Sequence, residues 1–337
     1  MTNIRIIPYS RADNEAALSL ERECPQGKSL VLRFQRPTFH ARSEVYEKYR
    51  MLGLKIQNKL VGVAAWAEKS VTLHGETIRA AYVYDVRVHP SYRKHGSAKM
   101  LTQAVLEDIG TDVDCIYTLI AGENERAIGL ARRSFGAQTV LPLTYSIFPV
   151  FKQHRSESNF RHTKALEAHQ MYLAHNGTIE FLPPFNENKL LGHAFSITIG
   201  QDRQAGASIW TNENLLAEEV VHLPRYYSVV RVLAALLRPF ALLPLIPKPN
   251  ETIRSWFLFD VYATGVGSFI DLLRGMNNLA FANERRFLYI LLQSDDPLLE
   301  IIKKAGFRFF TVPYYLLAKG RAIPGPAERV YLDIRDL

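Results

Sequence analysis

The sequence predicts an α/β (α+β) protein built from two similar halves in tandem. Three observations carry this prediction. The length of 337 residues suits two domains of about 150 residues each. Apolar runs alternate with amphipathic helical patterns in both halves, and part of the first half recurs in the second. With 47% hydrophobic and 22% charged residues, each half is able to bury a core.

The internal repeat pairs two stretches at a constant shift of 171 positions. Residues 124–148 align with residues 295–319 without a gap, so that two arginines face two lysines and a proline faces a proline. The strand-like runs that carry Asp85 and Asp260 match as well. Their shared order indicates duplication of one unit. The repeat predicts a first domain, a connecting segment and a second domain, at residues 1–150, 151–190 and 191–337.

Alternating strands and helices account for the first half in order. Strands are predicted where apolar residues alternate or run together, and His74-Gly75 is typical of a hairpin turn between two of them. Helices are predicted where apolar residues recur every three or four positions after a capping residue. The strands are expected at 4–9, 51–57, 59–73, 76–88, 115–121 and 139–148, and the helices at 11–23, 97–110 and 124–134.

The same patterns order the second half. Residues 232–247 are strongly apolar, but they are too short and too broken by Arg238, Pro239 and Pro244 to span a membrane. A core helix followed by an apolar loop is expected, and the alternatives are a surface-embedded segment or an acyl-chain pocket. The strands are expected at 193–200, 207–211, 255–264, 287–293 and 307–318, and the helices at 214–223, 226–237, 268–282 and 296–306.

Charge and cysteine content narrow the function classes. A formal net charge of +8 allows an anionic partner, but the chain has no long basic run with interleaved aromatics and no DNA-reading motif, so no DNA is expected as a partner. Cys24 and Cys115 are far apart, and the four histidines of residues 154–175 do not share a helical face. We expect no disulfide, no metal and, since the first residues lack the apolar core of a signal peptide, a cytoplasmic location.

Residues 88–101 have the chemistry of an anion site. Two cations and three small residues stand between a strand and a helix: Arg93, Lys94, Gly96, Ser97 and Ala98. Amides at a helix N-terminus have no partner inside the helix, and the helix dipole adds roughly half a positive charge there. Small side chains let an anion approach, and each cation adds a contact of about 1.5–3 kcal/mol where it is partly desolvated. A pyrophosphate site is therefore predicted, although the glycine patterns of P-loops and dinucleotide folds are absent.

The stretch RKHGSA, residues 93–98, resembles the hallmark of the GNAT superfamily of acyl-CoA-dependent N-acyltransferases, Arg/Gln-x-x-Gly-x-Gly/Ala. The order of strands and helices over residues 1–150 is also that family's order, and Asn124-x-x-Ala127 stands where the family opens its next helix. The resemblance implies two tandem GNAT-like domains, each with a mixed, mostly antiparallel sheet flanked by helices. The equivalent loop of the second half lacks the cations, so we expect no working CoA site there.

The resemblance also implies a set of cofactor-binding residues. In the family, the amides of this loop hold the diphosphate of acyl-CoA, and the preceding strand splays so that its backbone meets pantetheine and the thioester carbonyl. Acetyl-CoA is the expected co-substrate, and the apolar residues 232–247 leave room for a longer acyl-CoA. The residues carried over are Val86, Val88, Arg93, Lys94, His95, Gly96, Ser97 and Ala98, together with Asn124, whose alternative role is a plain helix cap.

Acyl transfer to nitrogen needs a neutral amine, so a base is expected to help by roughly 10²–10⁴-fold. Asp85 lies near the position where family members often keep an acidic residue, and a structural role shared with Asp260 is the alternative. Ala131 replaces the tyrosine that often protonates the thiolate in the family, which leaves Tyr145 as the candidate acid, with a core role as its alternative. Weaker candidates for the base are Tyr82, Tyr84 and His89. Tyr117, water or no acid at all are the alternatives to Tyr145.

Three functions remain open at this point. The leading one is an N-acyltransferase in which a small-molecule or peptide amine attacks acyl-CoA directly. The second is a Fem-like transferase that takes an amino acid from aminoacyl-tRNA, which shares the duplicated fold and suits the basic charge. The third is a non-catalytic acyl-CoA sensor or interaction module, for which the missing tyrosine at Ala131 and the altered second half argue.

Overall fold

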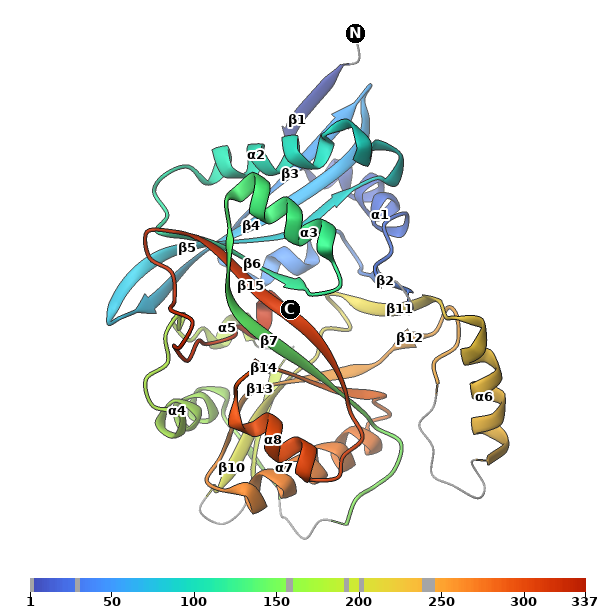
Figure 1. Cartoon of the computed structure of the whole chain (residues 1–337), viewed down its shortest axis with the longest axis vertical. Helices are drawn as coiled ribbons and strands as arrows, with labels where there is room; N and C mark the ends of the chain where they lie inside the picture. Colours follow the sequence, from blue (N-terminus) through green and yellow to red (C-terminus); the bar gives the residue numbers. More distant parts are fainter. Residues whose placement is uncertain (1–2, 28–30, 156–159, 191–193, 200–202, 238–245) are drawn as a thin grey trace.

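A computed structural model describes residues 3–27, 31–155, 160–190, 194–199, 203–237 and 246–337. Its main feature is a sheet of 12 strands that runs through both halves of the chain (Figure 1). In spatial order these strands are β1 (Ile4–Pro8), β3 (Lys48–Ile56), β4 (Lys59–Leu73), β5 (Glu76–Val88), β6 (Cys115–Ala121), β15 (Phe310–Gly320), β7 (Gln138–Pro149), β14 (Phe287–Gln293), β13 (Ser255–Ala263), β10 (Ala205–Trp210), β9 (Ala194–Ile199) and β8 (Phe160–Thr163). A second sheet contains β12 (Thr252–Ile253), β11 (Ala217–His222) and β2 (Val31–Gln35).

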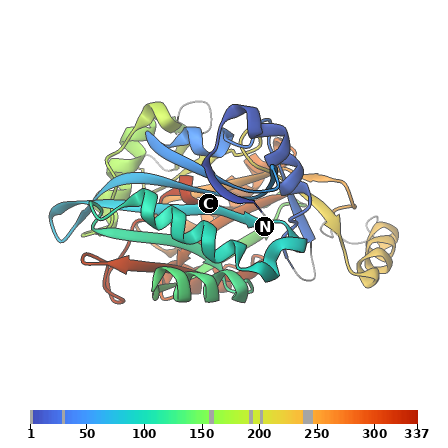
Figure 2. The ribbon, with the colours of Figure 1, turned by 90° about the horizontal axis from the view of Figure 1, so that it is seen from above.

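The main sheet is mixed and mostly antiparallel, as predicted. Within the described ranges its parallel pairs are β5 with β6 and β13 with β14. Helices cover both faces, and Figure 2 shows α2 and α3 on one side of the sheet with α1 and α4 on the other. The helices are α1 (Asn14–Arg22), α2 (Ser97–Ile109), α3 (Glu125–Leu130), α4 (Ala165–Asn176), α5 (Glu187–Leu190), α6 (Arg225–Leu237), α7 (Val266–Ala282) and α8 (Pro297–Lys304).

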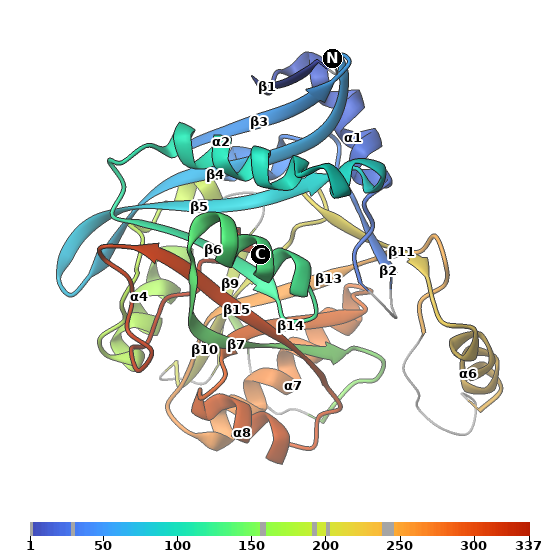
Figure 3. The same ribbon diagram turned by 45° about the horizontal axis from the view of Figure 1, so that its top comes forward.

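Corresponding strands of the two halves follow in the same order when the sheet is followed inward from either edge, as the internal repeat predicts. Strands β1, β3, β4, β5 and β6 of the first half correspond to β8, β9, β10, β13 and β14 of the second. The last strand of each half is exchanged, because β15 lies between β6 and β7, and β7 lies between β15 and β14. Figure 3 shows these two strands crossing the centre of the molecule. The two halves therefore share one continuous sheet.

Apolar side chains from the helices fix each half to its part of the sheet. Helix α2 packs on β3, β4 and β5, and its Leu101 and Val105 have no exposed surface. Helix α7 packs on β9, β10, β13 and β14 in the same way, through Phe269 and Leu272. These residues lie three or four positions apart, so the helical spacing seen in the sequence marks the buried face.

Residues 151–190, predicted as a connecting segment, contain β8 and α4. Strand β8 pairs with the outer edge of β9, and α4 packs on β9, β10 and β13. Ala168 of this helix is fully buried. The segment thus supplies an edge strand and a covering helix to the second half.

Residues 214–223, predicted as a helix, instead contain a strand, and β2 was not predicted at all. Strand β11 pairs antiparallel with β2 of the first half and with β12. Its Val220 has no exposed surface, and its Glu219 pairs across the ladder with Arg33 at 2.7 Å. Pairing with a strand about 190 positions away in sequence therefore overrides the local helical spacing.

Residues 232–237, the described start of the apolar stretch 232–247, are helical but mostly exposed, so the prediction of a core helix is wrong for them. Helix α6 ends at Leu237, and residues 238–245 lie outside the described part of the chain. The helix stands away from the rest of the molecule in Figures 1, 2 and 3. Of the helices in the described ranges, none has the length and apolar content that a membrane crossing requires. The large apolar side chains exposed on α6 are Tyr226, Val229, Val230, Val232, Leu233, Leu236 and Leu237.

Candidate active site

The predicted anion-binding loop lies between β5 and α2. A short 3-10 helix, Pro90–His95, leads to Gly96, which adopts a left-handed conformation with φ of 73°. A Cβ at this position would have nothing within 4 Å, so conformation and not space favours glycine here. The first helical hydrogen bond of α2 runs from the Met100 amide to the Gly96 carbonyl, at 3.0 Å. The amides before Met100 lie in the first turn of α2, for which an α-helix supplies no carbonyl of its own.

Side chains around this loop fix its entry from β5. Arg93 Nε donates a hydrogen bond to the Val88 carbonyl at 2.9 Å, and the Ser91 amide donates to His89 Nδ1 at 3.2 Å. Ser97 is buried, whereas Gly96 is exposed. The backbone of Lys94 and His95 belongs to the turn, but their side chains lie outside the described part of the structure. The role of this loop in binding the cofactor stays a prediction.

The backbones of β5 and β6 diverge next to this loop. Their parallel pairing covers Ala80–Tyr82 against Cys115–Tyr117, and β5 then continues for six residues and β6 for four. A bulge in β5 accompanies the divergence: Asp85 has φ of 51°, and the pairing with β4 shifts register between Val63 and Ala65. The stretch that carries Val86 and Val88 therefore leaves the β6 ladder, which is the splay that the family resemblance implies.

Asn124 caps α3. Its Oδ1 accepts a hydrogen bond from the Ala127 amide at 3.2 Å, so the cap role considered for this residue is confirmed. A contact of Asn124 with pantetheine stays a prediction. Ala131, at the place of the family's tyrosine, is buried in the α2 side of the core.

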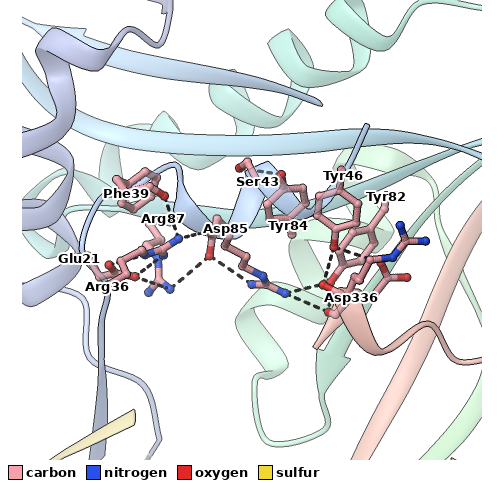
Figure 4. A network of polar contacts seen from close by, with 12 residues as sticks. Glu21, Arg36, Phe39, Ser43, Tyr46, Tyr82, Tyr84, Asp85, Arg87 and Asp336 are labelled. Carbon is pink, nitrogen blue, oxygen red and sulfur yellow. Dashed lines mark hydrogen bonds and ion pairs between the residues drawn. The ribbon is translucent and has the colours of Figure 1, made fainter. Parts of the chain in front are cut away.

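Asp85 is the centre of a buried charge network (Figure 4). Its Oδ2 lies 2.8 Å from Arg36, and its Oδ1 lies 3.4 Å from both Arg42 and Arg87. Glu21 pairs with Arg36 and, at 3.0 Å, with Arg87. Burial alone would raise the pKa of Asp85, but the three guanidinium groups hold that pKa well below its usual range. A carboxylate so held is a poor proton acceptor, so the geometry favours the structural alternative for Asp85.

Asp260 occupies the equivalent position in the second half. It also has a positive φ, 48°, at a shift of register, here between β10 and β13. Its partners differ, because His169 Nδ1 and the Tyr331 hydroxyl each lie 2.9 Å from its carboxylate. The positive φ of a buried aspartate at the bulge is thus common to both halves, while the three arginines belong to the first half.

Tyr145 lies in a cluster of tyrosines where the two halves meet. Its ring centroid is 5.1 Å from that of Tyr289 and 5.5 Å from that of Tyr314. Burial, and then the neighbouring Tyr289, Glu218 and Tyr314, raise the pKa of Tyr145 well above its usual range, so its phenol keeps its proton at neutral pH. Tyr314 pairs with Ala121 at the end of β6, so the cluster adjoins the place where β5 and β6 have diverged.

Glu218 on β11 is a candidate that the sequence did not reveal. The Tyr289 hydroxyl donates a hydrogen bond to its carboxylate at 3.0 Å, while the side chain keeps part of its surface exposed. Burial raises the pKa of Glu218 above its usual value, which makes it a better proton acceptor than a surface glutamate. Burial and then Glu218 also raise the pKa of Tyr314 to about 12, whereas Arg42 lowers it. The sequence signal that could have pointed to Glu218 is the pair of adjacent glutamates in an otherwise apolar stretch.

The equivalent loop of the second half is built differently. Gly265, which precedes α7, has an extended backbone with φ of −170° and no left-handed turn. The Ser268 hydroxyl forms hydrogen bonds with the backbone at the start of its own helix. It accepts one from the Gly265 amide at 3.1 Å and donates one to the Gly265 carbonyl at 2.8 Å. Among the described residues there is also no group of three or more His, Cys, Asp or Glu side chains placed to hold a metal ion.

Comparisons with known proteins agree with this architecture. Residues 6–139 match the family described as the acetyltransferase (GNAT) domain. A search of curated proteins gives no match. Among solved structures, N-myristoyltransferase of Saccharomyces cerevisiae with bound myristoyl-CoA is similar over 99% of this chain and 82% of its own, with a TM-score of 0.63 and 10% identity.

Two further structures have the same fold. A tandem GNAT protein from the clavulanic acid biosynthesis pathway is similar over 96% of this chain and 100% of its own, with a TM-score of 0.56 and 11% identity. A GCN5-related N-acetyltransferase from Anabaena variabilis is similar over 95% of this chain and 73% of its own, with a TM-score of 0.52 and 11% identity. Residues 6–139 therefore match the GNAT acetyltransferase domain, and the chain as a whole has the fold of a tandem GNAT protein.

Proposed function

We propose that this protein is an N-acyltransferase that transfers an acyl group from acyl-CoA to a primary amine of a small molecule or peptide. The observation that carries the proposal is the left-handed Gly96 at the start of α2, directly beside the diverging ends of β5 and β6. Amides in the first turn of a helix suit a diphosphate. Beyond Tyr82 the backbone of β5, which carries Val86 and Val88, no longer pairs with β6, and this side of the strand suits the amides of pantetheine. Acetyl-CoA is the proposed donor, and a longer acyl-CoA fits the same description.

In this proposal the reaction takes place at the tyrosine cluster, in a complex that holds both substrates. The amine nitrogen attacks the thioester carbonyl, the new C–N bond forms, and the C–S bond breaks with release of the CoA thiolate. Glu218 takes the proton that the nitrogen loses, directly or through a water molecule. Tyr145 donates a hydrogen bond to the departing thiolate, which then takes a proton from it or from water.

The direct test is native mass spectrometry of the purified protein, followed by a thiol-release assay with acetyl-CoA, myristoyl-CoA and a panel of amines. Bound CoA or acyl-CoA, and CoA release that depends on an amine, are expected. Copurified RNA, or transfer of a labelled amino acid from charged tRNA, would contradict the proposal in favour of a Fem-like transferase. Tight acyl-CoA binding without turnover across the panel would identify a sensor instead.

Glu218→Gln should lower kcat for the best amine by about 10²–10⁴-fold, because the amide cannot take the proton. A carboxylate acts as a base only when ionised, so wild-type activity should fall as the pH drops through the raised pKa of Glu218, above its usual 4.5. This acid limb should be missing in the variant. Both are measured as pH profiles of CoA release.

The matched control is Glu219→Gln, one residue along β11. Glu219 is buried against Arg33 and Gln35 and has no place in the proposed reaction, so its replacement should lower the melting temperature but keep the acid limb. Equal losses of kcat in the two variants, or an acid limb that survives in Glu218→Gln, would show that Glu218 is not the base.

A further inference from the structure

Helix α6 exposes many large apolar side chains for a helix of its length. Leu236 is 66% exposed, Val229 61% and Tyr226 59%. Isolated exposed apolar side chains are normal on protein surfaces, but a contiguous apolar patch marks a contact with something else. Because α6 stands away from the body of the molecule, the rest of the described chain does not cover it (Figure 1).

The exposed side chains gather on one side of the helix. At 100° per residue, the positions from Tyr226 to Leu237 with exposed apolar side chains fall within an arc of about 160°. Arg231 lies on the opposite side of the same helix. The apolar face is therefore broad and continuous, as in helices that lie flat in a membrane interface.

The charge around α6 has one sign. Residues 223–250 contain no aspartate or glutamate, although the chain has 33 acidic residues in 337. Within the described residues this stretch carries Arg225, Arg231 and Lys248. Two adjacent tyrosines, Tyr226 and Tyr227, stand at the start of the helix, and such rings favour the head-group region of a bilayer. A cationic segment with an apolar face is complementary to an anionic lipid surface.

The dimensions of α6 argue against two other roles for this helix, a membrane span and a dimer contact. Its 13 residues span roughly 20 Å, which is too short to cross a bilayer. The face of a single helix of this length buries only a few hundred Å² per partner, well below the roughly 800 Å² per partner of a stable dimer. Two copies would also bring cations of the same sign together.

We propose that α6 is a membrane-surface anchor, whose apolar face enters the head-group region of an anionic bilayer while the net positive charge of residues 223–250 attracts the lipid phosphates. This inference is independent of the proposed acyltransferase function. An anchored enzyme would work beside the membrane, with α6 joined to the body of the protein through β11 and β12.

The test is co-sedimentation of the full chain with vesicles of phosphatidylglycerol and phosphatidylcholine. Binding is expected to rise with the phosphatidylglycerol fraction and to fall with added salt. The double variant Leu233→Asp/Leu236→Asp should bind at least about tenfold more weakly, since two apolar contacts become charged. Val266→Asp, which changes an apolar side chain of α7 that is 54% exposed, should bind like the wild type.

A labelling experiment supplies a second measurement, because both native cysteines are buried. An environment-sensitive fluorophore on Leu233→Cys should shift to the blue when vesicles are added, whereas the same label on Val266→Cys should not. No binding by the wild type, equal binding by the Leu233/Leu236 double variant, or a dimer in analytical ultracentrifugation that this variant abolishes would each overturn the proposal.

Discussion

Gly96→Glu is expected to lower the affinity for acyl-CoA by at least about 100-fold while leaving the fold intact. The side chain would project into open space at the start of α2 and place a negative charge where the diphosphate is proposed to bind. Loss of one charge-assisted contact and repulsion of the ligand together cost about 3 kcal/mol, which is roughly a hundredfold in affinity. Isothermal titration with acetyl-CoA measures the effect, and Arg93→Glu should act in the same direction.

The chain offers a matched control for the strain of the substitution. Gly75, in the turn between β4 and β5, also has a positive φ, 80°, and a Cβ added there would have nothing within 4 Å. Gly75→Glu therefore places the same residue in the same kind of conformation, and it should change the melting temperature by about as much as Gly96→Glu does. An unchanged affinity in Gly96→Glu, or an equal loss in Gly75→Glu, would contradict the proposed diphosphate site.

Asp85→Asn is expected to destabilise the protein by about 3–5 kcal/mol at neutral pH. The substitution leaves Arg36, Arg42 and Arg87 buried around a neutral group, and Glu21 remains as an acidic partner of Arg36 and Arg87 alone. Urea unfolding measures the loss. In the second half, Asp260→Asn should cost no more than about 2 kcal/mol, because its partners are the neutral Tyr331 hydroxyl and a histidine.

The pH dependence of the loss of stability in Asp85→Asn tests whether charge is its cause. The folded-state pKa of Asp85 is lowered, so its stabilising contribution is fully present above its usual value of 3.8 and is lost as the pH falls toward the folded-state value. The difference in stability between wild type and Asp85→Asn should therefore shrink in acid. A difference that stays constant down to low pH would show that shape and not charge explains the loss.

Much of the fold could be predicted because local patterns and the repeat agree. The hairpin turn at His74-Gly75, the strands on either side of it and helix α2 lie where the spacing of apolar residues places them. The exchange of β7 and β15 could not be predicted, because either strand satisfies the same ladder and the choice depends on contacts between the halves. Strand β11 was missed for a related reason, since its partner β2 is remote in sequence.

Only part of the candidate site could be predicted from the sequence, for similar reasons. Gly96 and its cations form a continuous motif, so the loop could be recognised from the chain alone. The burial of Asp85 among charges depends on Arg36 and Arg42, which come from segments far from β5 in the sequence, and no sequence pattern predicts this contact. Glu218 reaches the tyrosine cluster only because β11 pairs with a strand of the other half.

The central claim is that the start of α2 holds the diphosphate of an acyl-CoA. A crystal structure of the protein grown with excess acetyl-CoA tests it most directly. The expected result is diphosphate density within hydrogen-bonding distance of the Gly96–Ala98 amides, with pantetheine running along the Val86–Val88 backbone. Density for the cofactor elsewhere, or a vacant loop under saturating acetyl-CoA, would contradict the account.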